Sequence, residues 1–392
     1  MRLPPGTRDW LAPELRRKRA VEAVLREVFE RWDYEEIETP TFERFDALEI
    51  GLGDGLAHLT FRFEDRGGSE LALRPEMTTP VARLVATRMR AARLPLRLSY
   101  LGRVYRYEQP QEGRMREFTQ AGLELIGPES FEADAEGLFT ALEALDALDL
   151  RDARFDINHA AIVDGLLAGL ALAPEALAQA KALIAGRNIV ALRERLAGSG
   201  DPGEIAALVE LVLARGGDEL LARAQARCPT DAGLRGIERL RRLMARARER
   251  GAGARIAVDL ALLRDVAYYT GFIFEGFADD LGFALCGGGR YDGLLPRFGL
   301  EAGAVGWSLS VERILIALER RHSKRFGAAP AIDVLVSGSH LIAARERAAG
   351  RIVRIDFEER SDDDLLEEAR RGRIPRVIVA RGADVRELEV EA

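Results

Sequence analysis

The sequence predicts an α+β fold, in which a strand-rich core is interrupted by a helical insertion and followed by a small C-terminal α/β domain. Three observations carry this prediction. Short strand patterns mixed with single helices run over residues 12–126 and resume near residue 256. Residues 160–250 are rich in Ala, Leu, Arg and Glu at helical spacing. Beyond a polar-to-small stretch at 321–331, short strands alternate with helices, which is typical of an α/β domain.

The first elements are a helix and a short strand. Apolar side chains at helical spacing, among them Val21, Leu25 and Phe29, predict a helix over residues 12–33. The alternating run 34–40 ends at a proline and predicts a strand. Further strands are expected at residues 61–63, 71–73, 98–101, 104–107 and 122–126, with a helix at 79–91 and a polar loop at 108–116.

The later elements follow the same patterns. Glycines at 198–203 and 216–217 should break the insertion into short helices. After the insertion, strands are expected at residues 273–275 and 283–285, with a helix from about Val311. In the C-terminal domain, strands are expected at residues 333–336, 352–355 and 377–380.

Length and composition limit the classes of protein. The chain has 392 residues, enough for two or three domains, and a formal net charge of −7. No apolar run approaches the roughly 20 residues that span a bilayer, and no secretory segment opens the chain, so we expect a cytoplasmic protein. Two cysteines without C-x-x-C spacing and four scattered histidines predict no metal site and no cofactor. The acidic balance argues against nucleic acid as the main partner.

The first segment that could carry chemistry is Leu73–Thr78, at the predicted end of a strand. Glu76 and Thr78 lie two residues apart, so they should point the same way there and could hold an ammonium group. A solvated turn explains this segment equally well.

The second segment is the hairpin from Arg106 to Glu124. Because strand side chains alternate, Gln120, Gly122 and Glu124 should share one face, and the glycine should leave room for a ligand. Arg106 leads the loop, and arginine suits bidentate recognition of a carboxylate or phosphate. An ordinary charged hairpin would not explain polar groups at both ends of one face.

The third segment has two parts, Arg264–Gly271 and Cys286–Leu294. The tyrosine pair Tyr268 and Tyr269 could be core packing, and the triple glycine could be a turn. Arg-Tyr-Asp-Gly directly after the glycines favours a close backbone approach to another group instead.

Together these segments resemble class II histidyl-tRNA synthetases, from Pro5-Gly6-Thr7 to about Leu318. The hairpin resembles motif 2, residues 305–313 resemble motif 3, and residues 34–40 resemble motif 1. Arg264 to Gly271 resembles the histidine-specific signature, usually Arg-Gly-Leu-Asp-Tyr-Tyr. The resemblance implies a class II aminoacyl-tRNA synthetase-like, mostly antiparallel sheet flanked by helices, with motif 1 at a homodimer interface.

The same resemblance implies a largely retained histidine pocket. Its residues would be Glu76, Thr78, Arg106, Gln120, Glu124, Arg264, Tyr268 and Tyr269. Vestigial ATP-binding positions would be Arg106, Glu108 and Arg313.

Several positions depart from the synthetase pattern. Asp265-Val266-Ala267 replaces Gly-Leu-Asp, which puts a carboxylate beside Arg264, and Ser310 replaces a motif 3 glycine near the adenine. Gln109 replaces the arginine of the motif 2 loop. The C-terminal domain, residues 327–392, is short for an anticodon-binding domain and holds 14 acidic side chains against 11 arginines. The apparatus for tRNA is thus reduced.

This combination resembles the regulatory subunits of ATP phosphoribosyltransferase, which are paralogues of histidyl-tRNA synthetase. The resemblance implies a non-catalytic subunit with a class II core at residues 1–320. It would bind L-histidine and form a hetero-oligomer with a short-form ATP phosphoribosyltransferase catalytic subunit. It would thereby permit the first step of histidine biosynthesis and its feedback inhibition. Because Arg106, Arg264 and Arg313 survive, an active histidyl-tRNA synthetase remains the alternative, and a bare RNA-binding module is a more distant one.

Overall fold

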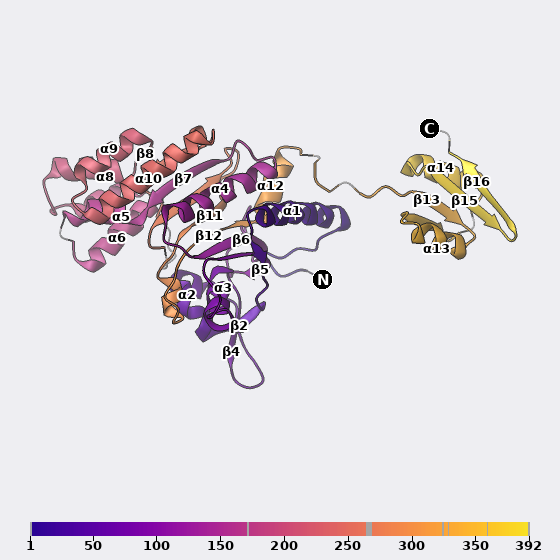
Figure 1. Ribbon diagram of the computed structural model, residues 1–392, viewed down its shortest axis with the longest axis horizontal. Coiled ribbons are helices and arrows are strands. Elements are labelled where there is room, and N and C mark those ends of the chain that lie inside the picture. Colours follow the sequence, from indigo (N-terminus) through magenta and orange to yellow (C-terminus); the bar gives the residue numbers. More distant parts are fainter. Residues whose placement is uncertain are drawn as a thin grey trace. The chain divides into compact units, whose positions relative to one another are not determined.

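The computed structural model describes residues 2–170, 172–263, 269–323, 325–327, 329–358 and 360–390, without the side chain of residue 54. The chain folds into two compact units, Met1–Phe326 and Gly327–Ala392, each with hydrophobic clusters of its own. Figure 1 shows the elements of both units.

A nine-stranded sheet forms the centre of the first unit, in the order β1-β5-β6-β12-β11-β10-β7-β9-β8. Within the described residues, only two ladders of this sheet are parallel, β1 with β5 and β7 with β9. The predicted class II-like, mostly antiparallel sheet is therefore confirmed. Its strands are β1 (Glu35–Glu36), β5 (Leu96–Tyr105), β6 (Glu117–Gly127), β7 (Arg154–His159), β8 (Arg215–Gly216), β9 (Ile256–Asp259), β10 (Phe272–Phe277), β11 (Ala284–Arg290) and β12 (Gly303–Ser310).

The longest ladder joins β5 to β6, from Leu96 opposite Ile126 to Tyr105 opposite Glu117. The two strands predicted at 98–101 and 104–107 are thus a single strand. Gly102 lies between them, and a side chain there would meet atoms of Arg74 and Met77 at 2.7 and 2.8 Å. The glycine therefore lets the strand pass close beneath the segment that precedes α3 (Thr78–Arg88).

The strand predicted at 34–40 is shorter than expected, because only Glu35–Glu36 pair in the sheet. The buried guanidinium of Arg74 accounts for the difference. It donates to the backbone carbonyls of Thr39 and Pro40 and to the Thr39 hydroxyl. These carbonyls are satisfied by a side chain instead of a neighbouring strand, so the sheet ends before them.

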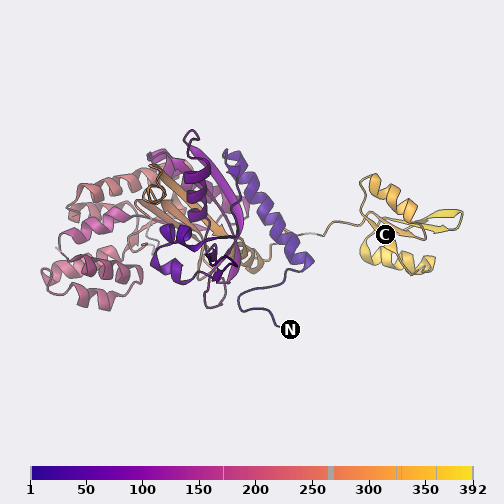
Figure 2. The same cartoon turned by 90° about the horizontal axis from the view of Figure 1, so that it is seen from below.

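Helices cover the two faces of the sheet (Figures 1 and 2). On one face α1 (Ala12–Arg31), α4 (Phe131–Ala147) and α12 (Val311–Arg320) pack over Leu123 and Trp307. On the other face α3 and α11 (Leu294–Arg297) pack over Leu98 and Tyr100. Because side chains alternate along β6, Gln120 and Glu124 face this second side, opposite to Leu123.

A small sheet in the order β2-β4-β3 lies beside α2 (Phe45–His58). Its strands are β2 (Phe42–Arg44), β3 (Arg62–Glu64) and β4 (Glu70–Leu73). The predicted strands at 61–63 and 71–73 correspond to β3 and β4. Helices α2 and α4 have no counterpart among the predicted elements. Helix α2 bends at Gly53, whose φ of 65° and ψ of 167° are not helical.

The helical insertion lies between β7 and β9. Its helices are α5 (Ala160–Ala168), α6 (Pro174–Ala185), α7 (Ile189–Leu196), α8 (Pro202–Val212), α9 (Asp218–Arg227) and α10 (Asp231–Glu249). Glycine-containing breaks separate α7 from α8 and α8 from α9, as predicted. The apolar faces of these helices join the cluster that also holds Phe155 and Phe272 of the central sheet.

The second unit is a four-stranded sheet in the order β14-β13-β15-β16, with helices α13 (His340–Ala348) and α14 (Asp362–Gly372). Strands β13 (Val334–Ser337), β14 (Val353–Asp356) and β15 (Arg376–Arg381) are parallel and were predicted. The antiparallel strand β16 (Asp384–Glu389) was not predicted, because its sequence is mostly charged and has too few apolar residues to show a strand pattern.

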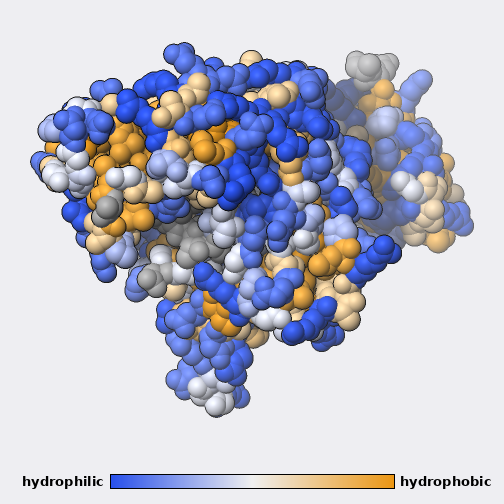
Figure 3. Space-filling model, turned by 60° about the vertical axis from the view of Figure 1, so that its left-hand side comes forward, coloured by the Kyte–Doolittle hydropathy of each residue, from blue (hydrophilic) through white to orange (hydrophobic). Residues whose placement is uncertain are grey.

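Hydrophilic side chains cover most of the face drawn in Figure 3, and hydrophobic ones gather there in small patches. Among the described residues, no helix combines the length and apolarity needed to cross a membrane.

Candidate functional site

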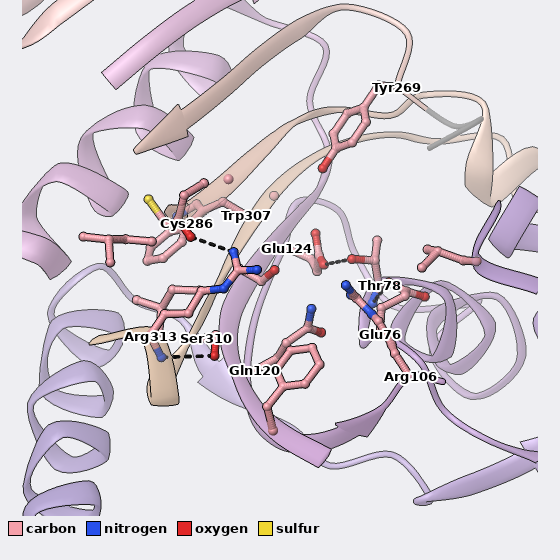
Figure 4. Close-up of a pocket in the computed structure, with 18 of the residues that line it drawn as sticks. Glu76, Thr78, Arg106, Gln120, Glu124, Tyr269, Cys286, Trp307, Ser310 and Arg313 are labelled. Atoms are coloured by element: carbon pink, nitrogen blue, oxygen red, sulfur yellow. Dashed lines mark hydrogen bonds between the residues drawn. The ribbon is translucent and has the colours of Figure 1, made fainter. Parts of the chain in front are cut away.

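A cavity of about 350 Å³ opens on the side of the central sheet that α3 covers. Seven of the predicted site residues line it: Glu76, Thr78, Arg106, Gln120, Glu124, Tyr269 and Arg313. Figure 4 shows Tyr269 pointing into the cavity, with Arg106 and Arg313 approaching from different sides. Glu108 instead lines a smaller neighbouring hollow of about 30 Å³. Arg264, Asp265 and Tyr268 lie outside the described residues.

Glu124 forms the floor of the cavity and is 1% exposed. Its Oε1 accepts hydrogen bonds from the hydroxyls of Thr78, at 2.9 Å, and Tyr100, at 3.1 Å. Its Oε2 accepts one from the hydroxyl of Tyr291. Burial raises the pKa of the Glu124 carboxyl to about 8, although these hydroxyls act in the opposite direction and Glu76 adds repulsion. A ligand with N–H donors would favour the ionised form.

The room predicted beside Gly122 is taken by the protein. Gly122 lies directly opposite Tyr100 in the ladder, and a side chain at Gly122 would lie 2.7 Å from the Tyr100 hydroxyl oxygen. The missing side chain thus lets the Tyr100 ring cross β6 and reach Glu124. The expectation that this glycine leaves space for a ligand was wrong, because a neighbouring strand fills the space first.

We expected Glu76 and Thr78 at the end of one strand, but they do not share a strand. Strand β4 ends at Leu73, and Thr78 begins α3. The Glu76 carboxylate accepts from the backbone amides of Thr78, at 2.6 Å, and Thr79, at 2.8 Å. The first amides of a helix lack partners within it and attract a carboxylate. Glu76 therefore stabilises the start of α3 and is only 3% exposed while it lines the cavity.

Gln120 is held in a defined orientation. Its Oε1 accepts from the backbone amide of Met77 at 3.1 Å. This bond leaves the side-chain amide nitrogen as the end that can donate to a ligand. Gln120 and Glu124 line the same cavity, as predicted from the alternation of strand side chains.

Arg106 follows β5, and its Nε donates to the backbone carbonyl of Pro75 at 2.7 Å. Its guanidinium lies 5.2 Å from the ring centroid of Phe118 and 3.9 Å from the Glu108 carboxylate. These contacts place a cation at the rim of the cavity, where it can meet an anionic group of a ligand.

Arg313 lies in the first turn of α12 and connects two segments by hydrogen bonds. Its Nε donates to the carbonyl of Gly113 at 2.8 Å, and its Nη1 donates to that of Ala284 at 2.7 Å. Burial lowers the pKa of Arg313, and Arg106 acts in the same direction. Ser310 caps α12, since its hydroxyl accepts from the Arg313 amide at 3.4 Å. Arg313 thus secures the loop of the β5–β6 hairpin against β11.

The triple glycine lies in β11, not in a turn. A side chain at Gly288 would overlap Trp307 and the backbone of Gly306. The glycine therefore allows β12 to pair closely with β11. Gly287 and Cys286 do line the cavity.

Two residues whose hydroxyls contact Glu124, Tyr100 and Tyr291, were not predicted as site residues. Tyr291 belongs to the Arg-Tyr-Asp-Gly run noted in the sequence, and Tyr100 could have been found from its register opposite Gly122.

The arrangement suits a small zwitterion with a polar side chain. Glu76, Gln120 and Glu124 offer acceptors and an amide at the floor, while Arg106 and Arg313 supply positive charge at the rim. Carboxylates can hold an ammonium or a ring N–H, and arginines can hold a carboxylate. The described residues contain no group of three His, Cys, Asp or Glu side chains placed to hold a metal ion.

Known proteins match most of the chain. Residues 6–314 match the family model described as histidyl-tRNA synthetase. The ATP phosphoribosyltransferase regulatory subunit of Moorella thermoacetica is 41% identical, covering 94% of this chain and 95% of that protein. An ATP phosphoribosyltransferase regulatory subunit/histidyl-tRNA synthetase from Bacillus halodurans C is similar in structure, with a TM-score of 0.84 and 29% identity over 98% of this chain and 99% of that one. A histidine–tRNA ligase subunit from Alicyclobacillus acidocaldarius gives a TM-score of 0.71 and 32% identity over 82% of this chain and 98% of that one.

Proposed function

The chain belongs to the family of ATP phosphoribosyltransferase regulatory subunits, which have the histidyl-tRNA synthetase fold, and on this basis we propose that it binds free L-histidine and passes the signal to a separate catalytic subunit. The subunit itself is non-catalytic and cytoplasmic. Its role is to permit the first step of histidine biosynthesis and to mediate feedback inhibition.

One observation carries the proposal: Glu124 is buried at the floor of a cavity with polar groups on several sides. Three hydroxyls fix its oxygens, and Gln120 presents an amide nearby. Free histidine offers a ring N–H, an ammonium and a carboxylate. The first two match the acceptors of Glu76 and Glu124, and the last matches Arg106. Arg264 and Tyr268 complete the proposed histidine site.

The partner is a short-form ATP phosphoribosyltransferase catalytic subunit. A regulatory subunit must assemble with the enzyme that it regulates, and ligand coupling requires two states that bind the ligand unequally. We expect a homodimer of this chain within the hetero-oligomer, with motif 1 near the dimer interface. A role in tRNA binding is not proposed, given the acidic balance of the C-terminal unit.

Calorimetry tests the pocket. L-histidine is titrated into the chain, alone and with the catalytic subunit, and into two variants. Glu124→Ala should weaken binding about tenfold or more, because a lost buried hydrogen-bond partner costs about 1–3 kcal/mol. Asp156→Asn is the control, since this carboxylate of β7 pairs with Arg215 of β8 and does not line the cavity. Absence of binding at millimolar histidine in the complex would contradict the proposal.

Assay of phosphoribosyl-ATP formation tests the regulation. The catalytic subunit is measured with and without this chain across a histidine titration. We expect activity to require this chain, and Glu124→Ala to reduce the sensitivity to histidine while the complex still co-purifies. Equal activity and equal inhibition of the catalytic subunit alone would contradict the regulatory role.

An active histidyl-tRNA synthetase is the second candidate, favoured by Arg106 and Arg313 lining one cavity. Histidine-dependent pyrophosphate–ATP exchange distinguishes the two. The regulatory proposal expects exchange to be absent or very slow, whereas robust exchange with charging of histidine tRNA would establish the synthetase.

A further inference from the structure

A buried carboxylate outside the cavity joins two distant parts of the first unit. Asp134, in the first turn of α4, has no exposed surface. Its Oδ1 accepts from Nε of Arg290 at 2.7 Å, and its Oδ2 accepts from Nε of Arg239. Arg290 ends β11, and Arg239 lies in α10 of the helical insertion. One carboxylate thus connects a strand of the cavity wall to the insertion.

Arg290 is anchored on several sides. Its Nη1 donates to Oδ1 of Asp292 at 2.9 Å and to the carbonyl of Pro128 at 3.2 Å. The next residue is Tyr291, whose hydroxyl donates to Glu124. Because the two residues are consecutive, the anchoring of Arg290 fixes the backbone from which the Tyr291 side chain extends into the cavity.

A second connection reaches the same place from the Tyr269 side. The amide of Thr270 donates to the carbonyl of Arg290 at 2.9 Å. The amide of Ala160, which begins α5, donates to the carbonyl of Gly271 at 3.0 Å. The segment that carries Tyr269 is therefore bonded both to Arg290 and to the first helix of the insertion.

The Arg239 side chain is 24% exposed and bonds to three groups of the chain around the start of α4. Besides Asp134, the guanidinium donates from Nη2 to the carbonyls of Ser130, at 2.8 Å, and Glu129, at 3.2 Å. A buried carboxylate that loses one of two cations is left poorly compensated, so its remaining partner must adjust. A displacement of α10 therefore reaches Arg290, and through it Tyr291.

We propose that Asp134 and Arg239 are positioning residues for the cavity, which hold the Tyr291 hydroxyl on Glu124 and tie the affinity for the ligand to the position of the helical insertion. The identity of the ligand rests on the proposed function. Because coupling is reciprocal, ligand binding must in turn restrain the insertion.

The test compares Arg239→Met with Arg246→Met. Both arginines lie in α10, but Arg246 is 42% exposed and pairs with the exposed carboxylates of Glu132, at 3.4 Å, and Glu249, at 3.3 Å, besides lying 6.0 Å from the ring centroid of Phe131. Calorimetry measures the affinity for L-histidine, and amide hydrogen exchange follows α5 and α10 with and without histidine. In the wild type, histidine should slow exchange in both helices. Arg239→Met should weaken histidine binding about tenfold and should lose the ligand-dependent slowing of exchange. Arg239→Lys should restore part of this slowing. Arg246→Met should resemble the wild type.

A ligand-independent measurement separates positioning from mere stabilisation. The Glu124 carboxyl is titrated by carbon-13 NMR, with Glu124→Gln to identify its signal. Among the described residues, the charged and titratable groups that interact with this carboxyl include Glu76, Tyr100, Tyr291 and Tyr34. In Arg239→Met the Tyr291 hydroxyl should no longer stabilise the carboxylate, so its pKa should rise above that of the wild type.

The outcomes are distinguishable. If the wild type binds histidine but exchange in α5 and α10 is unchanged, and Arg239→Met binds equally well, the inference is overturned while the proposed function stands. If the wild type binds no histidine in the complex, the proposed function fails, and the carboxyl titration alone decides the inference. An unchanged Glu124 pKa in Arg239→Met overturns it.

Discussion

Gly306 lies directly opposite Glu124 in the ladder of β6 and β12, and a Cβ at position 306 would overlap the Glu124 carboxylate. The glycine in β12 therefore provides the space in which this carboxylate lies flat across the neighbouring strand. The position of Glu124 depends on an absent side chain as much as on its three hydroxyl donors.

Gly306→Ala should displace the Glu124 carboxylate and weaken histidine binding about tenfold or more, which corresponds to roughly 1.4 kcal/mol. Calorimetry measures the affinity. Gly282→Ala is the control, because a side chain there meets no atom within 4 Å. Unchanged affinity in Gly306→Ala would show that the ligand does not depend on this carboxylate.

Glu124 should make stability fall as pH rises. Its pKa in the folded chain is about 8 against an ordinary value of 4.5, so between these values the folded state binds a proton that the unfolded state has lost. Stability should decline by about 1.4 kcal/mol per pH unit over this window, at most about 5 kcal/mol in all. Urea unfolding of Glu124→Gln should lack this decline, and parallel profiles for the two proteins would contradict the expectation.

His159 should make stability fall in acid. Burial lowers its pKa to about 4 from 6.5, and Arg239 and Arg290 add repulsion. As pH falls from 6.5 to 4, the unfolded state gains a proton that the folded state does not bind. About 3 kcal/mol should be lost over this range. In His159→Gln, stability should depend less on pH between 6.5 and 4. Above pH 7, its stability should have the same pH dependence as that of the wild type.

Lys18 should be a main anchor of α1. Its Nζ lies 2.7 Å from Oε1 of Glu312, and both side chains are less than a tenth exposed. Lys18→Met leaves Glu312 buried without its cation, so unfolding free energy should fall by about 3–5 kcal/mol. In the same helix, Arg26→Met removes an exposed pair with Glu36 and should cost no more than about 1 kcal/mol. Similar losses in both variants, measured by urea unfolding, would contradict this account.

Local patterns in the sequence were sufficient for several parts of the fold. The β5–β6 hairpin, the shared face of Gln120 and Glu124, and the broken helices of the insertion all follow from side-chain periodicity and glycine positions. These features depend on residues close in the chain, whose hydrogen-bond geometry is set by the element itself. Where a distant side chain intervened, as Arg74 does at Thr39 and Pro40, the local pattern overestimated the strand.

The chemistry of the cavity was decided by tertiary structure. Tyr291 reaches Glu124 from 167 residues away, and Arg313 binds the carbonyl of Gly113 across 200 residues. The sequence alone gives the residue types that line the cavity. Which hydroxyl holds which carboxylate, and which glycine makes room for it, depends on strand order and packing. The reason is physical: a buried polar group must find a partner among whatever the fold brings within reach, and that set is fixed only when the strands are assembled.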